Sequence, residues 1–161
     1  LGDVYKRQLY NDSIVAQIVK RFEKEDAIII YMPDHGEECY EENRGFICRN
    51  HSAAIDWPLA HYEFEIPFWI YCSRKYIRKH RDIYKQIRKA KDLRYMTDAL
   101  PHLLLYLAGI ETPTYQAKYN ILSPEYDEMR PRILKNSADY DKLRDEHIAK
   151  EKKANEKKKG K

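Results

Sequence analysis

The sequence of 161 residues contains no apolar run near the roughly 18 residues that a membrane-spanning helix requires. Its N-terminus also lacks the apolar core of a secretory signal, so no targeting segment is predicted within these residues. Cysteine is scarce, and Cys39, Cys48 and Cys72 form no CxxC pair, which disfavours a zinc ribbon or a thiol redox motif. A disulfide between Cys39 and Cys48 would suit an oxidising compartment, but the sequence decides neither the disulfide state nor the oligomeric state.

Charge, by contrast, is plentiful and unevenly placed. Charged residues make up 35% of the chain and the formal net charge is +4. The last twelve residues hold seven lysines and two glutamates, which leaves 23 basic and 24 acidic groups elsewhere. We therefore predict a lysine-rich disordered tail over residues 149–161. Nucleic-acid binding is not predicted, because no recognition module surrounds the basic residues.

The apolar pattern predicts alternating helices and strands. Asp12 or Ser13 can cap a helix whose apolar stripe ends at Phe22. The stretch KEDAIIIYMP is typical of a strand buried on both faces of a parallel sheet, and Pro33 would help to end it. Downstream we predict a long polar loop over residues 36–62, a strand in FEIPFWIYCS, a helix over residues 74–92, a helix in TDALPHLLLYLAGI that ends at Gly109, a turn-rich stretch over residues 111–132 and a terminal helix in DYDKLRDEHIAKEKK.

This order of elements predicts a layered α/β domain over residues 9–148. The helix over residues 74–92 is strongly basic, with nine Lys or Arg. A solvated outer helix explains that charge, and contact with anionic lipid is the alternative. Residues 1–8, LGDVYKRQ, look like translated sequencing-adaptor read-through, so we exclude them from the fold and expect the natural gene to continue upstream with another sequence.

The most informative motif is Asp34-His35-Gly36-Glu37, directly after the apolar strand. In open α/β sheets, ligands bind beyond the carboxyl ends of the strands. Gly36 supplies the permissive dihedrals that a sharp turn can need, so a carboxylate and an imidazole could converge on one ion. That pair suits zinc, although two ligands are too few for a stable site. A turn held by Asx hydrogen bonds is the alternative.

The stretches DAIIIYMPDHGEE, YEFEIPFWIYCSRKY and TDALPHLLLYLAGI together resemble the C-terminal half of the phosphoethanolamine transferases. These enzymes are sulfatase-like members of the alkaline phosphatase superfamily, and the similarity covers most of residues 12–145. The resemblance implies part of a layered α/β/α sulfatase-like fold. The Asp-His-Gly-Glu motif itself is shared across the superfamily, so it is not specific to one substrate.

The resemblance also implies roles for particular residues. Asp34 and His35 match the zinc-binding pair, and His51 lies where transferases place a histidine that protonates the leaving group. Glu37 and His61 are candidates to orient His35 or to face the site from nearby. Solvated or surface positions are the alternatives for His51, Glu37 and His61. No residue of this chain replaces the threonine nucleophile of the family or its upstream acidic zinc ligand.

The implied function is therefore that of a C-terminal fragment of a zinc-dependent phosphoethanolamine transferase, inactive alone. The full enzyme would move phosphoethanolamine from phosphatidylethanolamine to a cell-envelope glycolipid or glycan, and the sequence does not identify the acceptor. The resemblance places it in the bacterial inner membrane through N-terminal helices absent here, with this portion periplasmic and itself soluble. A sulfatase, a phosphodiesterase or phosphoglycerol transferase of the same superfamily, and a non-catalytic remnant are the alternatives.

Overall fold

The computed structural model describes residues 2–39, 47–48 and 54–159. The chain divides into two compact units, which we treat separately. The first unit is formed by residues 1–31 and 68–128, and the second by residues 32–67 and 129–161. Each unit has its own small apolar core.

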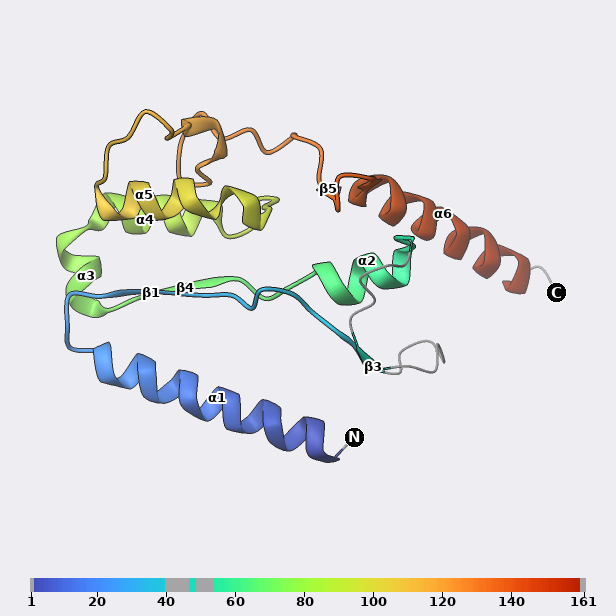
Figure 1. Ribbon diagram of the computed structural model, residues 1–161, viewed down its shortest axis with the longest axis horizontal. Coiled ribbons are helices and arrows are strands. Elements are labelled where there is room, and N and C mark those ends of the chain that lie inside the picture. The colour runs from blue at the N-terminus through green and yellow to red at the C-terminus, as the bar shows by residue number, and fades with distance from the viewer. Residues whose placement is uncertain (1, 40–46, 49–53, 160–161) are drawn as a thin grey trace. The chain divides into compact units, whose positions relative to one another are not determined.

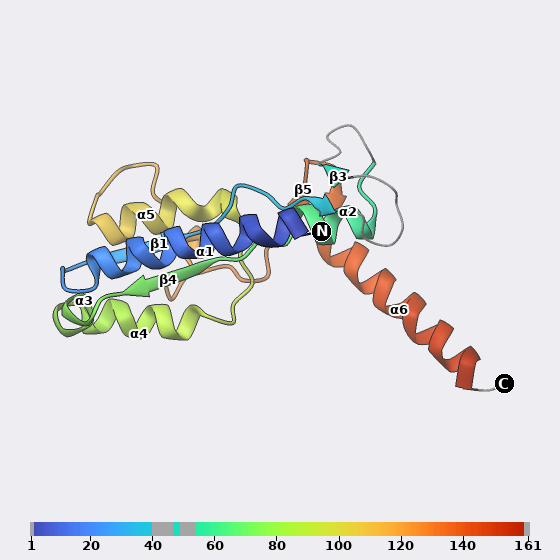
Figure 2. The ribbon, with the colours of Figure 1, turned by 90° about the horizontal axis from the view of Figure 1, so that it is seen from below.

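The first unit is a two-stranded sheet with helices on both faces. Figures 1 and 2 both show one helix, α1, along one face and two, α4 and α5, over the other. Its elements are α1 (Gly2–Phe22), β1 (Ile28–Tyr31), β4 (Trp69–Cys72), α3 (Arg74–Lys79), α4 (Arg81–Ala90), α5 (Leu100–Ala108) and the 3₁₀ turns Thr97–Ala99 and Ala117–Tyr119. Within this unit the layered α/β/α arrangement expected from the sequence is present.

The sheet of the first unit is antiparallel, which corrects the expectation of a parallel sheet. The strands β1 and β4 pair with Tyr31 opposite Trp69, and the two rings stack with their centroids 5.0 Å apart. All four residues of β1 are half-buried. The apolar run therefore indicated a strand correctly, but a run of this kind does not encode the direction of its neighbour.

The boundaries of the helices in the first unit follow local chemistry. Gly109 ends α5 in the left-handed region at φ 65°, as its position in the sequence predicted. The basic stretch forms two helices, α3 and α4, because the backbone at His80 leaves the helical conformation. At the other end of the unit, α1 starts at Gly2, so the predicted caps at Asp12 and Ser13 are wrong and both residues lie inside the helix.

The second unit is built from two small hairpins and two helices. Its elements are β2 (Glu38–Cys39), β3 (Ile47–Cys48), α2 (Trp57–Phe64), β5 (Ile133–Leu134), β6 (Ala138–Asp139) and α6 (Tyr140–Lys159). Each hairpin is antiparallel, β2 with β3 and β5 with β6. The helices α2 and α6 pack together around the buried side chains of Ala60, Leu134 and Tyr140.

Two expectations for the second unit need correction. Residues 36–62 are not one loop, because α2 begins inside them: the Asp56 side chain accepts a hydrogen bond from the Leu59 amide at 3.0 Å, and Pro58 occupies the first turn. The helix α6 also continues through most of the stretch expected to be a disordered tail, as far as Lys159. Lys, Glu and Ala have high helix propensity, which accounts for a helix without a packed face there.

One surface contact in the first unit makes stability depend on pH. The Asp26 carboxylate pairs with Lys79 Nζ at 2.7 Å and with His80 Nε2 at 3.6 Å. The hydrogen bond from Lys79 lowers the pKa of Asp26. A folded-state pKa below the unfolded one contributes stability above about pH 4, and this contribution is lost as the pH falls through the folded-state pKa.

We expect Asp26→Asn to lower the urea midpoint of unfolding at pH 7 and to change it little near pH 3. The matched control is Asp82→Asn, which removes the exposed pair with Lys85 within α4 and should shift neither midpoint measurably. If Asp26→Asn lowers the urea midpoint equally at both pH values, the ion pair is not the cause of the loss of stability.

Candidate metal centre

The candidate centre lies in the second unit, where Asp34 and His35 come two and three residues after Met32. Nε2 of His35 is 3.3 Å from Oδ2 of Asp34. The Asp34 side chain is 88% exposed and that of His35 25% exposed, so the ligand atoms are reachable from solvent. The structure thus brings together the two residues that the sequence singled out.

The hydrogen bond on the other side of the ring determines which nitrogen of His35 is available. Nδ1 lies 2.8 Å from the carbonyl oxygen of Gly36. A carbonyl oxygen only accepts, so Nδ1 carries the proton and donates it. The neutral ring then has its lone pair on Nε2, facing the Asp34 carboxylate. Two acceptor atoms this close repel each other unless a cation or a proton lies between them.

This spacing fits a zinc ion. Two ligand atoms bound at about 2.0–2.1 Å to a tetrahedral zinc ion are about 3.3–3.4 Å apart. The observed distance from Nε2 of His35 to Oδ2 of Asp34 is 3.3 Å. A backbone carbonyl that accepts from the distal nitrogen is also the usual way in which a metal-bound histidine is oriented.

A backbone contact holds the turn that carries the pair. The amide of Gly36 donates to the carbonyl of Glu63 in α2 at 2.9 Å. A Cβ atom at Gly36 would be 2.1 Å from the carbonyl oxygen of Tyr62. Gly36 does not have a positive φ, so its role differs from the one expected: glycine is needed here for close approach to α2 and not for an unusual dihedral.

The structure does not bring the other predicted residues of this region to the pair. Nδ1 of His61 is 3.0 Å from Oε2 of Glu65, and the ring stacks on Trp57 at 5.4 Å. Glu37 is exposed and has no hydrogen bond or ion pair with the described residues. Their roles beside His35 remain predictions without a contact to support them.

Two further predictions concern residues that the structure does not describe in full. His51 lies outside the described residues. The side chains of Cys39 and Cys48 are also outside them, although the backbone register sets Cys39 opposite Ile47 and Cys48 opposite Glu38. Cys72, in the first unit, is a free thiol, and burial raises its pKa. The predicted Cys39–Cys48 disulfide is therefore untested.

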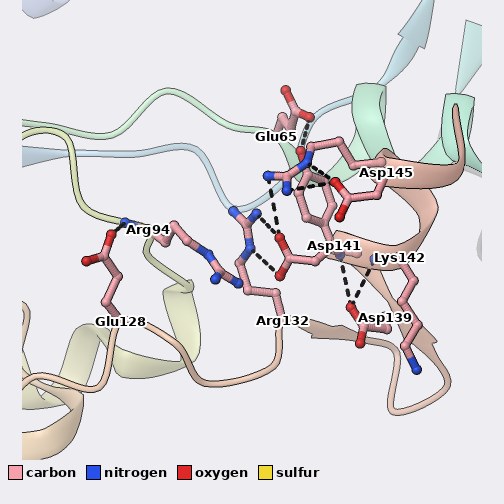
Figure 3. Close-up of polar contacts among 10 residues, drawn as sticks. Glu65, Arg94, Glu128, Arg132, Asp139, Asp141, Lys142 and Asp145 are labelled. Carbon is pink, nitrogen blue, oxygen red and sulfur yellow. Dashed lines mark hydrogen bonds and ion pairs between the residues drawn. The ribbon is translucent and has the colours of Figure 1, made fainter. Parts of the chain in front are cut away.

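A polar network fixes α6 beside the end of α2 within the second unit (Figure 3). Arg132 donates to both carboxylate oxygens of Asp141, at 3.2 and 2.5 Å. Tyr140 donates its hydroxyl to Glu65, and burial together with this bond raises the tyrosine pKa. The Asp139 carboxylate caps α6 by accepting from the amides of Asp141 and Lys142. The contact between Glu128 and the amide of Arg94 in the same picture belongs to the first unit.

Sequence reasoning missed one acidic residue of this region. Glu63 lies in α2 with only 2% of its surface exposed, and its carbonyl is the acceptor for Gly36. Glu38, the residue after Glu37, is 1% exposed in β2. The N-cap residue Asp56, followed by Pro58 in the first turn, was the sequence signal that could have placed Glu63 in a helix. Across residues 2–39, 47–48 and 54–159, however, no three His, Cys, Asp or Glu side chains form a group that could hold a metal ion.

The sequence was compared with known proteins, and two curated relatives match most of the chain. No family profile matches the sequence. Phosphoethanolamine transferase EptC of Escherichia coli O18:K1:H7 (strain RS218 / NMEC) is 31% identical over 130 residues, which is 79% of this chain and 21% of the relative. EptC of Escherichia coli strain K12 has the same identity and coverage. The chain thus spans about a fifth of the length of the curated relatives that it matches.

A solved structure agrees with the sequence relatives. The crystal structure of the C-terminal periplasmic domain of EptC from Escherichia coli matches 84% of this chain and 38% of its own length, with 28% identity and a TM-score of 0.65. The chain is related to the phosphoethanolamine transferases. The same periplasmic domain has been solved in complex with zinc and gives the same TM-score.

The relationship to phosphoethanolamine transferases confirms the resemblance and the fold class expected from the sequence. It also shows that a relative of this chain binds zinc in its periplasmic domain. None of the helices in the described part of the chain is both long and apolar enough to cross a membrane.

Proposed function

We propose that this chain supplies the Asp-His half of the zinc centre of a phosphoethanolamine transferase. The observation that carries the proposal is the 3.3 Å approach of His35 Nε2 to Asp34 Oδ2, with Nδ1 held by the carbonyl of Gly36. The relatives named phosphoethanolamine transferase EptC, one domain of which was solved with zinc, support it. The whole protein would transfer phosphoethanolamine from phosphatidylethanolamine to an envelope glycolipid or glycan, with this portion in the periplasm.

In this proposal each residue has a separate task. Asp34 supplies a carboxylate oxygen and His35 a neutral imidazole nitrogen to the metal, and Gly36 keeps the imidazole in the required tautomer. Bound zinc would lower the pKa of a nucleophilic hydroxyl and stabilise charge on phosphoryl oxygens. His51 remains the residue predicted to protonate the leaving group. The remaining ligands and the nucleophile would come from outside the described residues.

Zinc titration of the 161-residue chain tests the ligand pair. We expect Zn²⁺ to shift the ring resonances of His35 in NMR spectra with a saturable dependence on concentration. Asp34→Ala and His35→Ala should each weaken zinc affinity by more than about tenfold, because outer-shell changes alone cost 10–100-fold. The matched control is Glu125→Gln, an exposed acid outside the candidate centre, which should bind as the wild type does. Unchanged affinity in both ligand variants would overturn the assignment.

A chimera tests the reaction itself. The corresponding segment of Escherichia coli EptC would be replaced by residues 9–161, and phosphoethanolamine on envelope glycolipids would be measured by mass spectrometry. We expect transfer by the chimera and a loss of more than about 100-fold with Asp34→Ala, a change in the range of removing one strong stabilising group. A folded, zinc-loaded chimera without transfer would contradict the proposed function and leave the zinc assignment standing.

A further inference from the structure

The first unit carries a strongly cationic surface on α3 and α4. Between Arg74 and Asp92 the chain has nine Lys or Arg and two Asp. Eight of the nine cations are exposed. Seven of these lie on α3 and α4, and six remain when Lys79, which pairs with Asp26, is set aside. We call this set the cationic face, and it consists of Arg74, Arg78, Arg81, Lys85, Arg88 and Lys89.

Helical geometry separates the cationic face of α4 from its apolar face. At about 100° per residue, the four cations Arg81, Lys85, Arg88 and Lys89 span an arc of about 100°. Ile83 and Ile87 point the other way and pack against the apolar core of the unit. The cations of α4 are therefore concentrated on one side of the helix, opposite the side that packs against the core.

Most of these charges are not neutralised within the protein. Lys85 pairs with Asp82 at 3.1 Å, but both side chains are largely exposed, so the pair is weak. The other cations of the face make no ion pair with the described residues. A concentrated positive surface of this kind attracts an anionic partner and is screened by salt.

An apolar pocket borders the cationic face. It has a volume of about 280 Å³ and lies within the first unit. Apolar side chains and two cations, Arg88 and Lys91, share its lining, and Arg88 also belongs to the cationic face. The apolar part of the lining includes Phe68, Trp69, Ile87 and Leu93. Positive charge next to apolar and aromatic surface matches the boundary between headgroups and acyl chains.

We propose that the cationic face docks this domain on the surface of an anionic phospholipid bilayer. The apolar pocket beside Arg88 favours a bilayer over a nucleic acid, which would need base-stacking or groove-reading elements. The inference rests on the placement of charge in the first unit and does not depend on the proposed transfer chemistry.

Vesicle co-sedimentation of the 161-residue chain tests the docking. The vesicles would contain phosphatidylcholine with about 30% phosphatidylglycerol, and pure phosphatidylcholine vesicles would be the comparison. We expect binding to the anionic vesicles only, with a steep decrease as salt rises above about 0.1 M. Because each cation near the surface contributes about fivefold, R81Q/K85Q/R88Q/K89Q should reduce partitioning by at least about 100-fold.

The lysine-rich end of α6 provides a control of equal charge. K150Q/K152Q/K153Q/K157Q removes four charges from a helix segment with no apolar face and should reduce partitioning by less than about tenfold. The charge-conserving variant R81K/K85R/R88K/K89R should bind as the wild type does, which separates charge from folding defects. Equal losses from both neutral variants, equal binding to neutral vesicles, or tighter binding to single-stranded RNA at matched phosphate would each overturn the proposal.

Discussion

Replacing Gly36 by alanine is expected to lower the free energy of unfolding by about 3 kcal/mol. The added Cβ would be 2.1 Å from the carbonyl oxygen of Tyr62 and 3.4 Å from the Cα of Glu63. Both are backbone atoms of α2, so no side chain can rotate away to relieve the clash. Moving the turn would also break the 2.9 Å hydrogen bond from the Gly36 amide to the Glu63 carbonyl. Urea unfolding followed by circular dichroism measures the loss.

Gly109→Ala is the matched control for Gly36→Ala. Gly109 has φ 65°, but no atom lies within 4 Å of a Cβ placed there. Alanine at Gly109 therefore pays only the backbone strain, about 1 kcal/mol. If the two variants unfold at the same urea concentration, steric exclusion by α2 is not what requires glycine at Gly36.

The largest loss of stability in the first unit is expected from Leu103→Ala. Leu103 is completely buried in α5, in the core cluster that includes Ala90 and Ile121. Truncation removes apolar burial and leaves a cavity, which costs about 2–5 kcal/mol in the free energy of unfolding. Thermal and urea unfolding of the variant should show this loss.

The neighbouring residue gives the control for Leu103→Ala. Leu104 is 45% exposed on the same helix, so Leu104→Ala should change the free energy of unfolding by less than about 1 kcal/mol. Alanine also favours the helix slightly, which offsets part of the lost contact. Similar losses from the two variants would show that α5 does not face the core as described.

The elements of the first unit were the more predictable part of the fold. The apolar run at β1 and the glycine at the end of α5 act through local chemistry, and the structure confirms both. The direction of the β1–β4 pairing was not predictable in the same way, because it depends on how distant segments meet. The first turn of α2 had a readable signal in Asp56 and Pro58, but the polar composition of residues 36–62 obscured it.

At the candidate centre, too, a contact between sequence neighbours was predictable, whereas contacts between distant segments were not. The adjacent pair Asp34 and His35 was identified from the motif, and the structure brings their ligand atoms to 3.3 Å. The position of His61 just before the second predicted strand suggested a role for it as well, yet its ring nitrogen pairs with Glu65 on the next helical turn. The burial of Glu63 could not be predicted, because it depends on packing between α2 and segments remote in sequence.

The contact of Gly36 with α2 has a consequence for how this region can change during evolution. The turn touches the helix through carbonyl groups of the main chain, at Tyr62 and Glu63. A main-chain contact persists whatever side chains those two positions carry, provided that the helix keeps its path. The position of the turn therefore depends on the main-chain path of α2. Side chains on the outer surface of that helix can be substituted without loss of this contact.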